Sequence, residues 1–220
     1  MGKKNNLLRL SPYILGLILL SFLVGIALYD HLPDKIPMHW NLKGEVDSYG
    51  SKFYGTFSLP FFTLITYLIL IALPKIDPKR ENYAQFAHVY NIFTALMVLF
   101  LLSLYGVVLL ASFGYQPNVG VIVRIGLGLL FIVMGIYLPK IKHYYFIGIR
   151  TPWTLASEEV WIKTHKVGGI LFVSAGVLII LSILFDDVVG FFITMFSIFL
   201  FAAVSTVYSY LVYRKSSNSR

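Results

Sequence analysis

The chain has 220 residues; 58% are hydrophobic, 13% are charged, the formal net charge is +8, and cysteine is absent. Soluble domains average about 45–50% apolar and about 25% charged residues, so this composition excludes an ordinary water-soluble domain. The absence of cysteine excludes disulfides, zinc–thiolate centres and cysteine nucleophiles.

Long apolar runs, nearly free of charge, fill most of the chain. A helix needs about 20 residues to cross the hydrocarbon of a bilayer. We therefore predict transmembrane helices at residues 10–29, 57–73, 89–113, 119–138, 167–185 and 188–213. The expected fold class is an all-α integral membrane protein, a polytopic bundle of six transmembrane helices. We expect a single membrane domain over 1–220, in which 10–74 form the first helical hairpin.

Lysine and arginine are distributed unequally between the connections. One side of the predicted membrane carries most of them, whereas the other has only Lys35, Lys43 and Lys52. Because positively charged loops tend to stay in the cytoplasm, we expect both termini to be cytoplasmic and the loop at 30–56 to be extracellular. The cations are spread over several short segments, which does not favour direct binding of nucleic acid.

The predicted extracellular loop contains more proline, glycine, histidine and acidic residues than a simple connection needs. Pro33 and Pro37 favour extended backbone before them, and Gly44 and Gly50 permit turns. We expect a short extended segment that lies against the membrane surface.

Two interpretations of this loop are open. It is either a polar loop that Trp40 and Tyr49 anchor at the lipid headgroups, or a metal site. The polar loop is favoured because the ligands show no recognised metal-binding spacing. The side chains available to a metal are His31, Asp34, His39, Glu45 and Asp47.

The fourth run contains Arg124, the one charge predicted inside a span. Buried charges in a membrane are costly and usually have a partner or a path to water. Its side chain either snorkels to the outer surface or points into the bundle or contacts a ligand. Small residues predict close helix contacts, at Gly128 and Gly135 in the fourth run and at Gly169 and Gly176 in the fifth.

The segment at 139–185 contains a second connection with many polar and aromatic residues, and it runs into the fifth span. Pro152 disfavours a helix through the preceding residue, and Thr154 or Ser157 can cap a new helix that runs unbroken into the fifth span. On that helix Glu158, Trp161, His165 and Gly169 share one face. His165 is either a proton or metal group or, as we favour, an interfacial histidine bonded to Glu158 or to a backbone carbonyl.

Two motifs resemble a known family. Thr151-Pro152-Trp153-Thr154-Leu155, with Gly148 and Arg150 before it and Glu158 or Glu159, Trp161, His165 and Gly169 after it, resembles the motif of the SdpI-type bacterial immunity family. The outer segment Ile36-Pro37-Met38-His39-Trp40-Asn41, with Gly44, Asp47, Gly50 and Lys52, resembles the small domain of unknown function that usually precedes that motif.

The resemblance implies a multi-pass protein of the bacterial plasma membrane that gives immunity to a secreted killing peptide similar to SdpC. It also implies a possible second role, in which the protein senses the toxin and holds a cytoplasmic transcriptional repressor at the membrane. It implies no enzyme, no cofactor and no metal. The residues carried over for toxin recognition are Pro37, His39, Trp40, Gly44, Asp47 and Lys52. Those carried over for the cytoplasmic motif are Gly148, Arg150, Thr151, Pro152, Trp153, Thr154, Glu158, Trp161, His165 and Gly169.

Two other functional classes are weighed against immunity. A small-solute transporter or channel is the runner-up, although the predicted spans carry almost no ionisable residues and lack a pair of interrupted helices. A membrane metal-dependent hydrolase that uses Glu158, His165 and His143 is third, because no H-E-x-x-H or G-x-S-x-G sequence is present.

Overall fold

A computed structural model of the chain describes residues 11–76, 87–141 and 148–217. In these ranges six helical segments are long and apolar enough to cross a membrane, which confirms the predicted helical membrane protein. Their main helices are α1 (Pro12–Leu28), α2 (Lys52–Ile76), α3 (Ala87–Ser112), α4 (Val119–Tyr137), α6 (Glu158–Leu181) and α7 (Asp187–Ser217). The described part is therefore a multi-pass membrane protein.

Shorter elements join or extend these helices. An antiparallel pair of strands, β1 (Lys35–Trp40) and β2 (Val46–Ser51), stands between α1 and α2. A five-residue helix, α5 (Pro152–Ala156), precedes α6. Single turns of 3₁₀ helix extend three of the long helices, at η2 (Tyr29–His31), η4 (Leu138–Lys140) and η5 (Ser182–Leu184).

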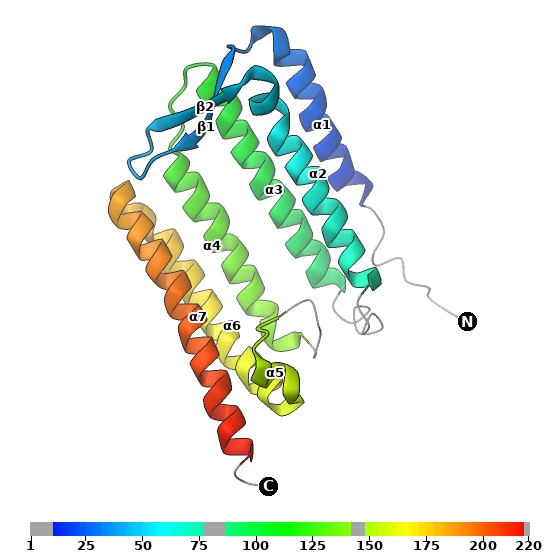
Figure 1. The fold of residues 1–220 in the computed structure, drawn as a ribbon, viewed down its shortest axis with the longest axis vertical. Coiled ribbons are helices and arrows are strands. Elements are labelled where there is room, and N and C mark those ends of the chain that lie inside the picture. The colour runs from blue at the N-terminus through cyan, green and yellow to red at the C-terminus, as the bar shows by residue number, and fades with distance from the viewer. Residues whose placement is uncertain (1–10, 77–86, 142–147, 218–220) are drawn as a thin grey trace, which may run out of the picture.

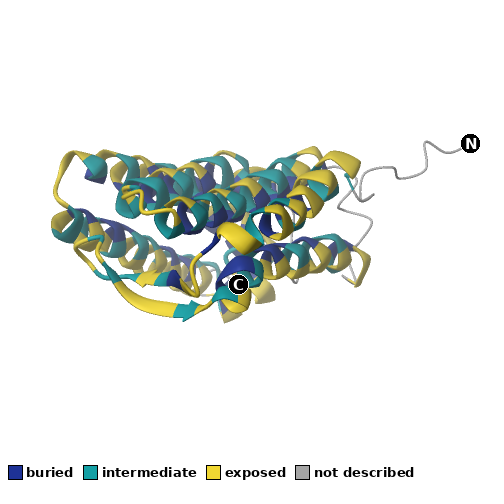
Figure 2. Ribbon diagram, turned by 90° about the horizontal axis from the view of Figure 1, so that it is seen from above, coloured by how far each residue is buried: buried dark blue, intermediate teal, exposed yellow. Residues whose placement is uncertain are grey.

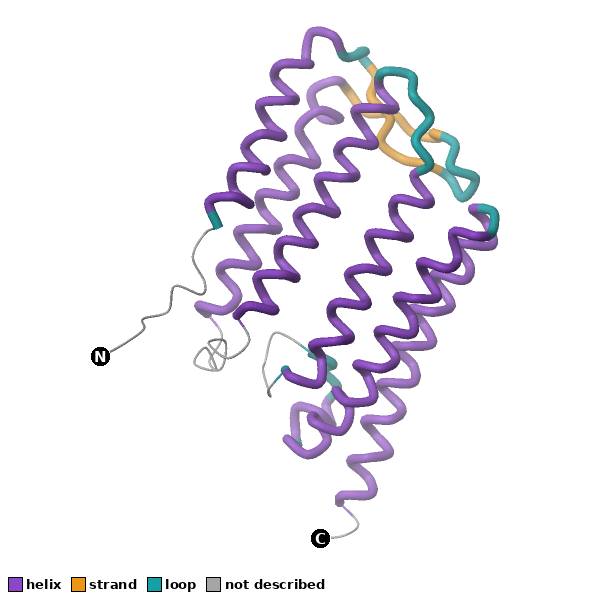
Figure 3. The backbone as a smooth tube through the Cα atoms, turned by 180° about the vertical axis from the view of Figure 1, so that it is seen from behind, coloured by secondary structure: helices purple, strands orange, loops and turns teal. Residues whose placement is uncertain are grey.

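The long helices pack in two groups of three, as Figures 1 and 3 show. The first group is α1, α2 and α3, whose shared core includes Ile18, Tyr67 and Val98. The second is α4, α6 and α7, in which α6 packs against both of its neighbours. Buried residues lie on the sides of the helices that face one another, and exposed residues lie largely outside (Figure 2). Outward-facing apolar side chains are expected where lipid is the solvent.

Two pairs of glycines bring α4 and α6 into backbone contact. A Cβ atom at Gly176 would lie 2.6 Å from the carbonyl oxygen of Gly128. A Cβ at Gly135 would lie 2.7 Å from the carbonyl oxygen of Gly169. Only a residue without a side chain leaves room for such an approach. The helix contacts predicted from the glycine spacing are confirmed.

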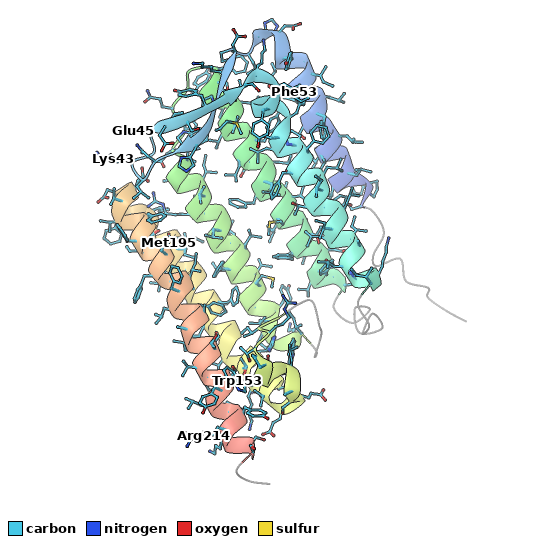
Figure 4. All side chains as sticks on the ribbon, in the orientation of Figure 1. Lys43, Glu45, Phe53, Trp153, Met195 and Arg214 are labelled. Carbon is cyan, nitrogen blue, oxygen red and sulfur yellow. The ribbon has the colours of Figure 1, made fainter. Side chains whose placement is uncertain are left out.

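The bundle has two distinct ends (Figure 1). The hairpin end carries the β1–β2 hairpin and the connections α3–α4 and α6–α7. The motif end carries α5 and the start of α6. Figure 4 shows Lys43 and Glu45 at the hairpin end, and Trp153 and Arg214 at the opposite end. Which end faces the cytoplasm stays a prediction from the distribution of lysine and arginine.

Candidate functional sites at the two ends of the bundle

The loop that was predicted to be extracellular and extended forms a hairpin. Its strands pair with Ile36 opposite Gly50 and Trp40 opposite Val46. The turn is built by Asn41, whose side-chain oxygen accepts hydrogen bonds from the backbone N–H groups of residues 43 (2.9 Å) and 45 (3.1 Å). Gly44 lies in this turn with a φ of +76°, a conformation that suits glycine. The predicted turn at Gly44 is confirmed.

Gly50 permits a turn, but it does not form one. Gly50 lies inside β2, and its φ is not positive. A Cβ at this position would lie 2.9 Å from Cγ of Met38, so the glycine serves close packing across the hairpin. Gly is permissive for a turn, but it also suits a site where a neighbouring group approaches the backbone closely.

The hairpin is fixed onto the helices by apolar contacts. Leu32 and Ile36 are buried in a cluster with Val108 of α3. Ile36 also packs so closely over Gly55 of α2 that a Cβ there would overlap with it. Burial of each such aliphatic side chain contributes about 1.5–3 kcal/mol. The hairpin is therefore a packed part of the protein.

The exposed side of the hairpin carries paired charges. His39 Nδ1 lies 2.6 Å from Asp47 Oδ1, and the two side chains are 68% and 42% exposed. Glu45 accepts a hydrogen bond of 2.9 Å from the side-chain nitrogen of Asn41. The ammonium group of Lys52 lies 5.0 Å from the centre of the Tyr29 ring. In the described ranges no group of three or more His, Asp or Glu side chains is placed to hold a metal ion.

The two other residues carried over for toxin recognition are less accessible. Trp40 is half-buried, and Pro37 is buried at the base of β1. Pro37 therefore shapes the strand, whereas His39, Asp47 and Glu45 present polar groups to the solvent.

Arg124 points into the bundle. Its side chain is 5% exposed, so the snorkelling interpretation is wrong. It donates hydrogen bonds to the carbonyl oxygens of Gly120 (2.9 Å) and Ser182 (3.0 Å), and it forms an ion pair with Asp187 in the first turn of α7. This network ties α4 to the α6–α7 connection. A buried guanidinium is tolerated where its donors are satisfied in this way.

Two glycines make room for the ion pair. A Cβ at Gly190 would overlap with the guanidinium group of Arg124, and a Cβ at Gly120 would overlap with the carboxylate of Asp187. These roles were not anticipated from the sequence. The available signals were an acid at the start of the last run and a glycine near each of the two charges.

At the motif end, two threonines fold the backbone before α6. Thr151 and Thr154 form a reciprocal capping box that begins α5. Thr154 also donates a hydrogen bond of 2.8 Å to the carbonyl oxygen of Ile149, and the Thr151 hydroxyl lies 2.9 Å from that of Ser209 on α7. Both threonines are buried. The Trp153 ring packs against Tyr210, also on α7.

Trp161 and His165 form the buried centre of the motif end. Each is 1% exposed, and their rings stack with centroids 3.9 Å apart. Trp161 Nε1 donates a hydrogen bond of 2.9 Å to the carbonyl oxygen of Ile141. Tyr90 of α3 and Leu138 complete the cluster, so this centre connects the two groups of helices.

His165 uses both ring nitrogens. Nδ1 lies 2.8 Å from the carbonyl oxygen of Trp161, and Nε2 accepts a hydrogen bond of 3.0 Å from the backbone N–H of Ile149. A neutral imidazole with its proton on Nδ1 satisfies both contacts. This arrangement agrees with the favoured interpretation of a histidine bonded to a backbone carbonyl. It leaves no ring nitrogen for a metal.

Glycines of the motif fit against this centre. Gly148 has a φ of +120°, and a Cβ there would lie 2.7 Å from Cη2 of Trp161. A Cβ at Gly169 would lie 2.8 Å from Cγ of Pro139. Each glycine is therefore required by a close approach.

A relative decides the family. The immunity protein SdpI of Bacillus subtilis (strain 168) is 31% identical over 204 residues, which cover 93% of this chain and 96% of that protein. The chain belongs to the SdpI/YfhL protein family. The model of this family matches residues 140–209, and the model of a domain of unknown function, DUF1648, matches residues 16–64. No solved structure matches the chain.

The SdpI-family match covers Trp161 and His165 of the buried cluster and the exposed surface at the motif end, whereas Tyr90 and Leu138 of the cluster lie outside it. Ser157 caps α6, and Glu158 and Glu159 occupy its first turn, as predicted. Glu158 is exposed, however, whereas Trp161, His165 and Gly169 are buried, so Glu158 is not part of the cluster. Arg150 and Pro152 are also exposed. His143, which the hydrolase alternative needs, lies outside the described residues.

Proposed function

We propose that this chain is a membrane immunity protein that protects a bacterium from a secreted peptide toxin. The observation that carries the proposal is the 31% identity to an immunity protein, which extends over 93% of the chain. A likeness over 93% of the chain covers most of its length, and the two family models match the hairpin and the motif separately. The proposal assigns no catalytic residue, and it places the hairpin end outside the cell because that side carries few lysines and arginines.

The two ends have different roles in this proposal. The exposed groups of the hairpin, chiefly His39, Asp47 and Lys43, are available to a ligand that arrives from outside. The buried groups of the motif end bond to one another and to the backbone, and they hold the inner ends of α4, α6 and α7 together. In this proposal, recognition of the toxin belongs to the hairpin end, and the buried groups of the motif maintain the fold.

Toxin sensing with a cytoplasmic transcriptional repressor is the finer part of the proposal. A surface for such a partner would lie at the motif end, where Arg150, Glu158 and Lys166 are exposed. Toxin binding can change that surface only if the toxin prefers one arrangement of the helices over another. The test is the membrane recruitment of a labelled repressor, with and without toxin, in cells that carry Glu158→Ala or Lys166→Ala.

Immunity itself is tested by challenge. The chain is expressed in a bacterium that is sensitive to the SdpC killing peptide, and survival is compared with that of cells that carry the empty vector. We expect survival to rise at least tenfold. Equal survival at matched membrane abundance of the protein would contradict the proposal.

The orientation is tested separately, because a chain without cysteine accepts single-cysteine probes. Lys43→Cys at the hairpin end should react with an impermeant maleimide in intact cells. Lys215→Cys at the end of α7 should react only after the membrane is opened. The reverse pattern would place the hairpin inside the cell.

A further inference from the structure

Two hollows adjoin one another at the hairpin end. The first is a polar cavity of about 820 Å³ between the hairpin and the α3–α4 connection. Lys35, Lys43 and Glu45 of the hairpin line it, together with Asp187 of α7. Asp187 lies directly below the hairpin turn, since its Oδ2 is 3.4 Å from the Cβ position of Gly44. This cavity presents both signs of charge.

The second hollow is an apolar cleft of about 690 Å³ between α2, α3 and α4, beneath the hairpin. Phenylalanines of α2 form one wall, and Leu104 of α3 and Val123 of α4 form the others. Phe53 and Phe62 at its margin are 62% and 56% exposed on the outside of the bundle. Phe62 lies inside a helix that is long and apolar enough to cross a membrane, so we infer that the cleft opens sideways toward lipid.

The two hollows share part of their lining. Trp40 of β1 and Val119 at the start of α4 border both of them. A single ligand can therefore extend from the membrane into the aqueous cavity without crossing the bundle. Such a ligand must be apolar along one part and polar along the other.

The polar cavity favours a peptide over a lipid as this ligand. Its lining combines the two lysines with Glu45 and with the carboxamides of Gln116 and Asn118, a mixture of donors and acceptors that suits the polar groups of a peptide. In the described ranges the sheet has only β1 and β2, so each strand has one edge without a strand partner. Strand edges of this kind offer backbone N–H and C=O groups to an extended peptide.

We propose that the polar cavity and the apolar cleft together form the docking site for the toxin. An apolar stretch of the peptide enters the cleft between α2, α3 and α4 from the membrane. The adjoining polar stretch lies extended in the cavity under the hairpin, with Trp40 between the two parts. This inference rests on the proposed immunity function and identifies where on the protein the toxin is held.

The test fills the cleft and leaves the rest of the protein intact. Val123→Trp places an indole in the cleft, and Val177→Trp is the matched control, because Val177 lies on α6 with 41% of its surface exposed. The full chain is reconstituted in phospholipid vesicles, and binding of fluorescent SdpC peptide is titrated. We expect Val123→Trp to weaken binding at least tenfold and to abolish protection, and Val177→Trp to stay within twofold of the parent chain.

A second measurement does not depend on how well the tryptophan variant folds. A benzophenone attached to Val123→Cys should cross-link to the peptide on illumination, and the same probe on Val177→Cys should not. If a folded Val123→Trp bound the peptide as the parent chain does, and no cross-link formed at position 123, the docking site would be overturned. Protection by the parent chain would still uphold the immunity function. Loss of a co-purified phospholipid from Val123→Trp with unchanged peptide affinity would assign the hollows to lipid and overturn the inference. Failure of the parent chain to protect would overturn both.

Discussion

The two ends of the bundle use the same residue types in opposite ways. At the hairpin end His39 is exposed and pairs with the exposed Asp47. At the motif end His165 is buried, and both of its nitrogens bind backbone groups. The hairpin end therefore keeps this polar pair accessible beside two hollows, whereas the buried polar groups of the motif end hold the chain together. A sequence motif that resembles a functional site can thus be a folding element.

The largest effect is expected at the buried ion pair of the hairpin end, which is an exception to the exposed polar groups found there. Asp187→Leu leaves Arg124, whose side chain is 5% exposed, without its carboxylate partner. We expect a loss of about 3–5 kcal/mol in the free energy of unfolding. Arg124→Leu should cost less, because the remaining Asp187 is 27% exposed. The measurement is thermal unfolding in detergent.

The double variant is the control for this pair. With both charges removed, Arg124→Leu with Asp187→Leu should recover much of the stability lost by Asp187→Leu alone. Equal losses from the two single variants, with no recovery in the double variant, would contradict the buried ion pair.

The next prediction concerns the glycine contacts between α4 and α6. Gly176→Leu forces a side chain against the backbone of Gly128, and overpacking of this kind costs about 1–3 kcal/mol or more. We expect a lower unfolding temperature and reduced membrane abundance. Gly106→Leu on α3 is the matched control, since a Cβ there would meet no atom within 4 Å. Equal effects at the two positions would show that the backbones do not touch.

A substitution at His165 tests most directly whether the motif end has a structural role. His165→Phe keeps a ring beside Trp161 but leaves the partly buried N–H of Ile149 without its acceptor, which costs about 1–3 kcal/mol. His88→Phe changes an exposed histidine on α3 and should leave the unfolding temperature unchanged. Wild-type stability of His165→Phe combined with loss of protection would instead make His165 a direct functional group.

The smallest effect on stability is expected at the exposed pair of the hairpin. His39→Ala should change the free energy of unfolding by only about 0.2–1 kcal/mol, because exposed ion pairs contribute little. Protection should nevertheless fall. The control is Lys163→Ala, which removes an exposed lysine that pairs with Glu159 at the motif end. If both variants protected equally well, the hairpin pair would have no part in recognition.

The transmembrane helices could be predicted because their cause is local. Each apolar run is long enough to span the hydrocarbon, and the described helices include every predicted run with modest differences at the ends. The start of α6 was also predictable, since Ser157 and the two glutamates form a local capping pattern. The glycine contacts followed from spacing along single helices.

Contacts between distant residues could not be predicted in the same way. Arg124 pairs with a residue 63 positions away, and Thr151 with one 58 positions away. Nothing in the local pattern of either residue names its partner. Proline and glycine likewise predicted extended backbone at the hairpin but not the pairing of its strands. The packing role of Gly50 was missed because its close approach to Met38 arises only after the strands pair.

The glycine positions around the buried ion pair have a consequence for the history of this family. Gly120 and Gly190 have no room for a methyl group while the guanidinium and carboxylate occupy the space beside them. A lineage that exchanged the arginine for a short residue would release both glycines from this restriction. Positions 120, 124, 187 and 190 should therefore vary together among homologous chains, as a set inherited or lost as one.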